Sequence, residues 1–227
     1  LTSTMAEAKV VSATLDGSIA VGSTATVTVV GGAPSAATST VAVSPASISA
    51  DGGTSTVTVT VRDAHSNRVV GSPVALSATG TGNAIAQPVA TTNANGVGTG
   101  TLSSTVAEAK TISATAGGTA ITETAVVTVT PGVVSNALSI VTLSSPTVAS
   151  GASIAVTLIS RDAAGNNRTT GGAAVSFWHM TGTSTGDLVP NPAIDNGDGT
   201  YSATFTGVSA GTPAEISATI NGNYLTS

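Results

Sequence analysis

The stretch STVTVTVRD, from Ser55 to Asp63, alternates valine with threonine and decides how the chain folds. In an extended strand, successive side chains point to opposite faces, so Val57, Val59 and Val61 share one face and the threonines share the other. Branched side chains also favour the pleated backbone of a sheet. The stretch therefore predicts a β-strand with one buried face and one solvated face.

Similar strand patterns follow, separated by turn-forming residues. VALSAT (Val74–Thr79) places Val74, Leu76 and Ala78 on one face, and TAVVTVT (Thr124–Thr130) alternates again. Gly, Asn, Asp and Ser cluster between the runs, in ADGG, HSN, TGTGN and NANG, and these residues favour tight turns. About seven short strands at this spacing indicate an all-β fold, an antiparallel β-sandwich of immunoglobulin type.

Composition supports a folded β-protein and argues against several classes of function. Apolar residues make up 41% of the 227 residues and charged residues only 7%, a balance unlike that of disordered chains. The Lys and Arg residues number 6, are scattered singly, and leave a net charge of −5, which argues against nucleic-acid binding. There is no cysteine for a disulfide framework, and no apolar run is long enough to predict membrane insertion.

One phrase occurs three times along the chain. STMAEAKVVSAT (Ser3–Thr14), STVAEAKTISAT (Ser104–Thr115) and the more divergent SAGTPAEISATI (Ser209–Ile220) lie about 100 residues apart. That period is too long for a solenoid repeat and matches a small domain. We therefore expect an array of tandem β-sandwiches.

The phase of the repeat predicts the domain boundaries. Residues 1–31 correspond to the C-terminal strands of a preceding Ig-like domain, and residues 32–132 to one complete domain. Residues 133–227 correspond to a second domain that lacks its last strand, the counterpart of ETAVVTVTPG (Glu123–Gly132). The connecting segments are short, so we expect closely tethered neighbours.

The first of the two larger segments contains Asp51-Gly52, Arg62-Asp63-Ala64, Asn67 and Thr92–Gly96. The more divergent second segment keeps Arg161-Asp162-Ala163 and Gly165-Asn166, and it has DNGDGTYSATFTG (Asp195–Gly207) instead of the Asn-Gly hairpin. With these motifs the chain resembles the bacterial Ig-like domains of the invasin/intimin family of surface adhesins. The resemblance covers nearly the whole chain, and it implies a bacterial cell-surface or extracellular location. In that family such domains mostly act as rigid spacers, and receptor binding belongs to a tip module.

Local motifs give little support to catalysis. GVSAG (Gly207–Gly211) fits a hydrolase nucleophile pattern, but that motif needs a strand followed by a helix, and Ser209 lies in a strand-rich repeat. His65 and His179 fall in different domains, so no catalytic triad is expected. DNGDGT (Asp195–Thr200) lacks the alternating spacing of a calcium loop and predicts a hairpin turn instead. We expect no enzyme activity, no metal and no cofactor.

Four charged residues receive structural predictions. Asp63 and Asp162 each begin a turn, where a short carboxylate accepts hydrogen bonds from backbone N–H groups. The phrase AEAK, which ends at Lys110, is expected to form a turn or a partly helical crossing between strands. We expect Glu108 and Lys110 to be solvated.

VSFWHM (Val175–Met180) is the most unusual stretch of the chain. Alternation places Val175 and Phe177 inward and sends Trp178 and Met180 outward. The simpler interpretation is that Trp178 covers a loop or a domain junction. The sharper hypothesis is that Trp178 and Met180 contact a partner, because exposed aromatic side chains often anchor interfaces.

Together these features predict a non-enzymatic structural segment of a bacterial cell-surface or secreted adhesin, whose tandem Ig-like domains form a rod that presents a binding tip. Its partners would be the neighbouring Ig-like domains, with a host or cell-surface receptor bound by regions outside this chain. One alternative is a subunit of a filament or virion surface, self-assembled by strand exchange between residues 23–32 and 213–227. Others are a carbohydrate- or protein-binding module centred on Trp178 and an accessory region of a secreted hydrolase.

Overall fold

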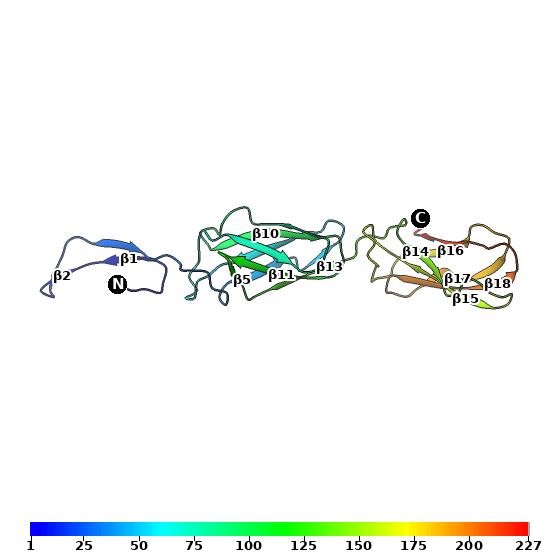
Figure 1. Cartoon of the computed structure of the whole chain (residues 1–227), viewed down its shortest axis with the longest axis horizontal. Coiled ribbons are helices and arrows are strands. Elements are labelled where there is room, and N and C mark those ends of the chain that lie inside the picture. Colours follow the sequence, from blue (N-terminus) through cyan, green and yellow to red (C-terminus); the bar gives the residue numbers. More distant parts are fainter. Residues whose placement is uncertain (227) are drawn as a thin grey trace. The chain divides into compact units, whose positions relative to one another are not determined.

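The computed structural model describes residues 1–226, and these form β-strands joined by turns and bends, without a helix. Figure 1 labels many of these strands and colours the chain along its sequence. The chain divides into two compact units. The first comprises Leu1–Ile48, Gly53–Ser104 and Glu108–Val129, and the second comprises Ser49–Gly52, Thr105–Ala107 and the residues from Thr130 onward. The prediction of an all-β fold is confirmed.

The strands between Thr40 and Thr130 form a sandwich of two sheets. They are β5 (Thr40–Ser44), β6 (Ser47–Ser49), β7 (Ser55–Thr60), β8 (Val74–Ala78), β9 (Asn83–Ala86), β10 (Val97–Ser104), β11 (Ala109–Ala116), β12 (Thr119–Ala120) and β13 (Ala125–Thr130). One sheet has the order β5-β7-β10-β9, and the other has the order β12-β11-β13-β6, with β8 also paired to β11. This arrangement agrees with the predicted immunoglobulin-type sandwich.

Valines of β7 supply much of the core of this sandwich, as their alternation predicts. Val57, Val59 and Val61 are buried, and Leu76 of β8 is buried as well. Gly100 of β10 lies opposite Val57. A Cβ at this glycine would come within 2.6 Å of both the carbonyl oxygen of Ala86 on β9 and Leu76 Cδ1 on the other sheet. The glycine therefore permits the close approach of both β9 and the opposing sheet.

The first 31 residues form a hairpin that repeats the last strands of the sandwich. The strands are β1 (Ala8–Val11), β2 (Thr14–Leu15), β3 (Ile19–Ala20) and β4 (Ala25–Thr28). β1 pairs with β4 from Ala8↔Thr28, as β11 pairs with β13 from Ala109↔Thr128. Val27 of β4 is 48% exposed, whereas Val127 at the same position of β13 is 0% exposed. The hairpin thus has the pairing of β11 and β13 without the packing partners of those strands.

The second unit contains the strands that follow Thr130. They are β14 (Ile140–Leu143), β15 (Ser153–Ile159), β16 (Val175–His179), β17 (Thr185–Asp195), β18 (Thr200–Ser209), β19 (Ile216–Ile220) and β20 (Asn223–Tyr224). One sheet has the order β14-β15-β18-β17 and the other β16-β19-β20. The core includes Val156, Leu158, Val175, Phe177, Tyr201 and Phe205. The predicted inward positions of Val175 and Phe177 are therefore confirmed.

The prediction that Lys110 is solvated is wrong. Its side chain is 0% exposed, while that of its ion-pair partner Glu108 remains 41% exposed. The reason is the alternation of β11, which places Lys110 on the same buried face as Ile112 and Ala114. The amine Nζ also donates to the carbonyl oxygen of Thr81 at 2.6 Å, so the buried charge has two acceptors.

Candidate functional site

A buried carboxylate organises the turn that follows β7. The oxygen Oδ1 of Asp63 accepts hydrogen bonds from the backbone N–H groups of His65 and Asn67, each at 2.9 Å. This is the turn chemistry that the sequence predicts. The other oxygen, Oδ2, accepts the backbone N–H of Gly32 at 2.9 Å. Asp63 therefore fastens the segment before β5 to the turn after β7.

The side chain of Asn67 extends these contacts to the first residues of the unit. Its Nδ2 donates to Asp63 Oδ2 at 2.9 Å and to the carbonyl oxygen of Thr4 at 2.7 Å. Its Oδ1 accepts the backbone N–H of Ala6 at 2.9 Å. Thr4 and Ala6 belong to the repeated phrase STMAEAK, so the phrase supplies backbone groups that Asn67 binds. We call an aspartate and asparagine joined in this way the Asp–Asn clasp.

The second unit contains the same clasp, formed by Asp162 and Asn166. Asp162 Oδ1 accepts the N–H groups of Ala164 and Asn166, each at 2.9 Å, and Oδ2 accepts the N–H of Gly132 at 2.8 Å. Asn166 Nδ2 donates to Asp162 Oδ2 at 2.7 Å.

Asn166 also reaches the loop Thr105–Ala107, which belongs to the second unit. Its Nδ2 donates to the carbonyl oxygen of Thr105 at 2.9 Å, and its Oδ1 accepts the N–H of Ala107 at 2.9 Å. Thr105 and Ala107 occupy the places of Thr4 and Ala6 in the phrase STVAEAK. The contacts of Asn67 with Thr4 and Ala6 thus have equivalents in the second clasp.

Hydrogen bonds stabilise the ionised form of both aspartates. The N–H of Gly32 is the largest influence on Asp63, and together with Asn67 and His65 it outweighs burial and lowers the pKa from 3.8 to about 2. For Asp162, burial alone would raise the pKa, but the bonds from Asn166, Gly132 and Ala164 lower it. Carboxylates that accept several N–H groups are held in the charged state in this way.

This geometry suits a connector better than a reactive centre. The carboxylate of Asp63 already accepts hydrogen bonds from Gly32, His65 and Asn67. Throughout residues 1–226, no group of three or more His, Cys, Asp or Glu side chains lies close enough together to hold a metal ion. The chemical capacity of the clasp is to join backbone segments by charge-assisted hydrogen bonds.

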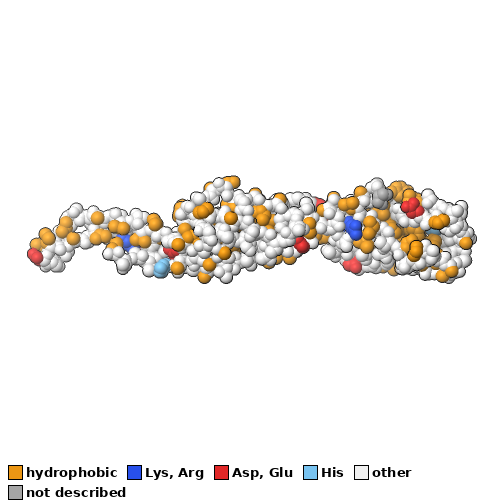
Figure 2. Space-filling model, in the orientation of Figure 1, with side chains coloured by type: hydrophobic (Ala, Val, Ile, Leu, Met, Phe, Trp, Pro, Cys, Tyr) orange, Lys and Arg blue, Asp and Glu red, His pale blue; other side chains and the backbone are white. Residues whose placement is uncertain are grey.

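Apart from the buried Lys110, most charged side chains outside the two clasps are dispersed over the surface. Figure 2 shows the Lys, Arg, Asp and Glu side chains as isolated spots on the face that it displays, among uncharged atoms. The described part of the chain also contains no helix with the length and apolarity needed to cross a membrane.

Trp178 and Met180 lie where alternation places them, on the opposite face of β16 from Phe177. The Trp178 ring is half-buried and meets the Tyr224 ring edge-to-face, with centroids 5.2 Å apart. Met180 is 48% exposed. The indole Nε1 of Trp178 is buried without a hydrogen-bond partner. A partner contact through Trp178 and Met180 stays a prediction.

The candidate residues for catalysis or metal binding do not form a common site. Ser209 ends β18 and is followed by an irregular segment, so the strand–turn–helix context of a nucleophile is missing there. The ring of His179 lies 5.2 Å from that of Phe205. Asp195 and Thr200 flank the hairpin turn between β17 and β18, as predicted. Asp195 Oδ1 accepts the N–H of Gly197 at 2.9 Å, which is ordinary turn chemistry.

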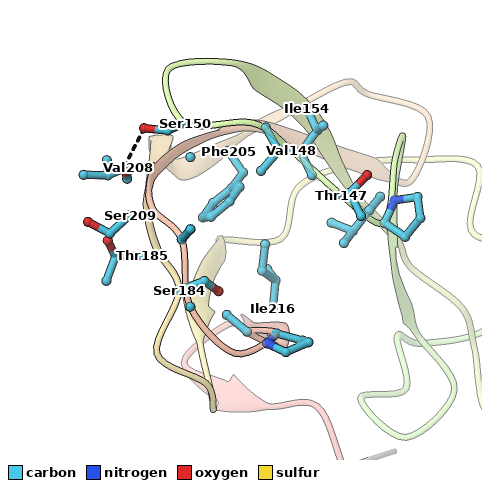
Figure 3. Close-up of a pocket in the computed structure, with 17 residues that line it drawn as sticks. Thr147, Val148, Ser150, Ile154, Ser184, Thr185, Phe205, Val208, Ser209 and Ile216 are labelled. Carbon is cyan, nitrogen blue, oxygen red and sulfur yellow. Dashed lines mark hydrogen bonds between the residues drawn. The ribbon is translucent and has the colours of Figure 1, made fainter.

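The second unit also contains an apolar groove with a volume of about 300 Å³. Figure 3 shows Val148, Ile154, Phe205 and Ile216 around this space. One rim includes Ser150, whose hydroxyl donates to the carbonyl oxygen of Val208 at 2.7 Å. The groove lies between the segment around Val148 and the start of β19, and it contains no cluster of ionisable groups.

Family comparison identifies the two repeats. Residues 35–132 and residues 135–227 each match the family model described as invasin, domain 3. The chain belongs to the invasin domain 3 family. The resemblance indicated by the sequence motifs is therefore confirmed, while the domain boundaries at residues 31 and 132 stay a prediction.

Solved structures similar to this invasin domain 3 chain include bacterial adhesins. The Escherichia coli adhesin FdeC is 28% identical, with a TM-score of 0.59 over 97% of this chain and 71% of that one. Yersinia pseudotuberculosis InvD is 29% identical, with a TM-score of 0.55 over 84% of this chain and 55% of that one. The solved chain of invasin, a bacterial integrin-binding protein, is 24% identical with a TM-score of 0.60, and the match covers 99% of this chain and 44% of that one. Among curated proteins, none matches the chain in sequence.

Sequence reasoning identifies only half of the clasp in the invasin domain 3 repeats. The turns at Asp63 and Asp162 are predicted from the residue type, but the contacts of Asn67 and Asn166 with the repeated phrase are not. One signal for these contacts is present in the sequence. The phrase STxAEAK and the turn that contains the aspartate and asparagine both recur, at nearly the same spacing along the chain. Two motifs that recur together are candidates for mutual contact.

Proposed function

We propose that this chain is a non-enzymatic spacer segment of a bacterial surface adhesin. Membership of the invasin domain 3 family and similarity to the adhesin FdeC support the proposal. In this proposal tandem Ig-like domains, with the hairpin 1–31 as the end of a preceding domain, form a rod on the outer bacterial surface. The rod presents a receptor-binding tip that lies outside this chain.

The observation that carries the proposal is the recurrence of the Asp–Asn clasp. A spacer must resist bending where one repeat follows another, so its stiffening contacts are expected to recur with the repeat. Asn67 and Asn166 bind the same two backbone positions of the phrase STxAEAK, at distances of 2.7–2.9 Å. A receptor-binding residue has no such reason to appear in each repeat.

The experiment replaces Asn166 by alanine in the 227-residue chain and uses Asn167→Ala as the matched control. Asn167 is the next residue and accepts a hydrogen bond from Arg161 Nε at the surface. NMR relaxation measures the rotational correlation time of each unit, and hydrogen exchange measures the protection of the Ala107 amide. We expect Asn166→Ala to expose this amide and to give the two units separate, shorter correlation times.

The control variant shows whether the effect is specific to the side chain of Asn166. Asn167→Ala should leave both the correlation times and the Ala107 amide unchanged. Separate tumbling of the units in the unmodified chain would contradict a stiff spacer, and so would an Asn166→Ala chain that behaves like the control.

A binding module centred on Trp178 is the second candidate. It is favoured by the Trp178–Tyr224 ring pair, because the first repeat has Ser77 and Ala120 at the corresponding positions. The double variant Trp178→Ser, Met180→Thr restores the residues of the first repeat. The module predicts that the unmodified chain binds components of a glycan array or immobilised matrix proteins and that the double variant does not. A spacer predicts no binding by either chain.

A further inference from the structure

The turn after β7 places two arginines directly opposite each other. Arg62 and Arg68 form an antiparallel bridge. Backbone hydrogen bonds of 2.9 and 3.0 Å flank this bridge on its two sides, and neither of them joins the two arginines. Such a non-hydrogen-bonded pair brings the Cα atoms to about 4.5 Å and the side chains closest together. The two side chains therefore leave the backbone on the same face, next to each other.

Neither arginine has an acidic partner. The ion pairs formed within residues 1–226 both involve lysines. Arg62 Nη1 donates to the carbonyl oxygen of Ser66 at 2.7 Å, and Arg68 Nη1 donates to Asn95 Oδ1 at 2.8 Å. Both acceptors are neutral. A guanidinium group has five N–H donors, so most donors of each arginine remain available to a ligand.

The carboxylate next in sequence does not compensate this positive charge. Asp63 follows Arg62 in extended backbone, so its side chain points to the opposite face. It is buried there, and its two oxygens accept the hydrogen bonds of the clasp. Like charges that lie directly opposite each other destabilise a strand pair. An anion bound between the two guanidinium groups would relieve this repulsion.

The second repeat satisfies the corresponding arginine internally. Its equivalent bridge joins Arg161 to Asn167, and Arg161 Nε donates to Asn167 Oδ1 at 2.9 Å. Asn167 is exposed, as Arg68 is, although a complete sandwich precedes it in the chain, so this position is exposed in both settings. Arg68 replaces that acceptor by a second cation. The arginine pair occurs in one repeat only, unlike the clasp, and a spacer does not require it.

The two arginines line a groove with a volume of about 730 Å³, which lies within the range of small-molecule sites. We call it the arginine groove. Most of its lining belongs to the sandwich itself, namely Arg62, Ser66, Asn67, Arg68, Val70 and Ala94. Val70 is 60% exposed, and Ala94 is exposed as well. The groove thus combines a pair of cations with exposed apolar side chains.

We infer that the arginine groove binds a sulfate or phosphate ester carried on a glycan. A guanidinium group donates two parallel N–H bonds to two oxygens of such an anion, and two facing arginines can hold one anion between them. Val70 and Ala94 then offer apolar contact to the C–H face of the sugar ring. The site gives the chain a ligand in addition to the spacer role proposed above, and it depends neither on that role nor on the Asp–Asn clasp.

The experiment titrates the isotope-labelled chain with oligosaccharides and follows its amide and arginine Nε–H signals by NMR. The probes are a heparin hexasaccharide, which carries sulfate esters, and a phosphorylated mannan oligosaccharide. The control ligand is the same hexasaccharide after desulfation, which retains its carboxylates. We expect shifts confined to the surroundings of Arg62, Arg68 and Ala94, with at least tenfold weaker binding of the control ligand. The tighter of the two esters identifies the anion.

A pair of variants tests the residues. Arg68→Asn introduces the residue of the second repeat, so the turn should fold, and the affinity for the tighter ester should fall at least tenfold. Arg161→Asn is the matched control, because it removes the same charge beside the equivalent bridge of the second repeat. It should bind like the unmodified chain. Equal losses in the two variants, equal binding of the desulfated ligand, or no shifts near Arg62 and Arg68 would overturn the inference.

Thermal unfolding without ligand tests whether the arginine pair is uncompensated. Arg68→Asn removes the repulsion and gives Arg62 the acceptor that Arg161 has in the second repeat, so the midpoint of the first unit should stay equal or rise. Addition of the tighter ester should raise the midpoint of the unmodified chain and leave that of Arg68→Asn unchanged. A lower midpoint for Arg68→Asn without ligand would show that Arg68 stabilises the turn by itself, and it would contradict a pair that awaits an anion.

Discussion

At the scale of single residues, the Asp–Asn clasp shows how one carboxylate can organise several backbone segments. Asp63 is buried, yet it accepts hydrogen bonds from Gly32, His65 and Asn67. These bonds compensate the cost of removing the charge from water. A substitution that removes an acceptor leaves buried N–H groups without a partner, and the stability of the turn should fall accordingly.

Asp63→Asn should reduce the free energy of unfolding by about 1–3 kcal/mol near neutral pH, because it converts an acceptor into a donor facing N–H groups. The pKa of Asp63 is lowered from 3.8 to about 2. A depressed pKa gives stability that is present above pH 3.8 and is lost as the pH falls through about 2. The deficit of the variant should therefore shrink across that range.

Urea unfolding at a series of pH values measures this deficit. Asp16→Asn is the control, since Asp16 lies in an exposed turn with a φ of 51°, a conformation that asparagine also tolerates. A deficit that stays constant down to pH 2 would show that the Asp63 charge is not the cause.

Lys110 provides a second test at the residue scale. Its ion-pair partner Glu108 is 41% exposed and can be solvated if the amine is removed. Lys110→Met should therefore cost no more than about 1 kcal/mol, the loss of a hydrogen bond to Thr81. Lys110→Ala also leaves a cavity and should cost about 2–5 kcal/mol. Thermal unfolding of the two variants distinguishes them, and equal losses would indicate that the charge, not the packing, matters.

At the scale of elements, alternating apolar residues place one face of each strand in the core, and glycine allows close packing where neighbouring elements approach. Val57, Val59 and Val61 could be assigned to a buried face from spacing alone, because a strand has a fixed period. The burial of Lys110 could not be predicted in this way. The strand period shows which residues share a face, but it does not show that a lysine will lie on the buried face. Its acceptor Thr81 lies 29 residues away, a separation that no local pattern reveals.

Gly100→Ala should test the close packing around β10. A Cβ at Gly100 would come within 2.6 Å of both the Ala86 carbonyl oxygen and Leu76 Cδ1, and overpacking of this kind costs about 1–3 kcal/mol. Gly22→Ala is the control, because nothing lies within 4 Å of a Cβ there. Chemical denaturation should show a loss for Gly100→Ala and essentially none for Gly22→Ala. A neutral Gly100→Ala would mean that β9 and Leu76 can move away from a methyl group without cost.

At the scale of the whole molecule, the chain consists of two units with separate cores. Tandem repetition was predictable, since a phrase that recurs at the length of a domain indicates an array of domains. The groove of the second unit was not predictable from the sequence, because its lining depends on how side chains such as Phe205 and Ile154 pack. Asn166 and Thr105 are 61 residues apart in the sequence. A single sequence does not show that two residues so far apart lie in contact.

The separate cores should unfold in separable steps. Trp178 lies in the second unit and the chain has 1 tryptophan, so its fluorescence reports that unit alone. Phe177→Ala should move the fluorescence transition to lower denaturant, by a loss of about 3–5 kcal/mol. Leu102→Ala should instead shift the step seen only by circular dichroism, by about 2–5 kcal/mol. Coincident shifts of both signals in both variants would show that the chain unfolds as one unit.

The clasp has a consequence for the evolution of the gene. Asn67 and Asn166 contact main-chain atoms of the preceding phrase, an oxygen and an N–H in each case. Recognition of the main chain places no demand on the side chains of the phrase, provided that its backbone keeps the same path. A copy of one repeat can then be inserted beside any other, or removed, without matching substitutions. Unequal recombination would therefore alter the number of repeats without disrupting the hydrogen bonds of the clasp.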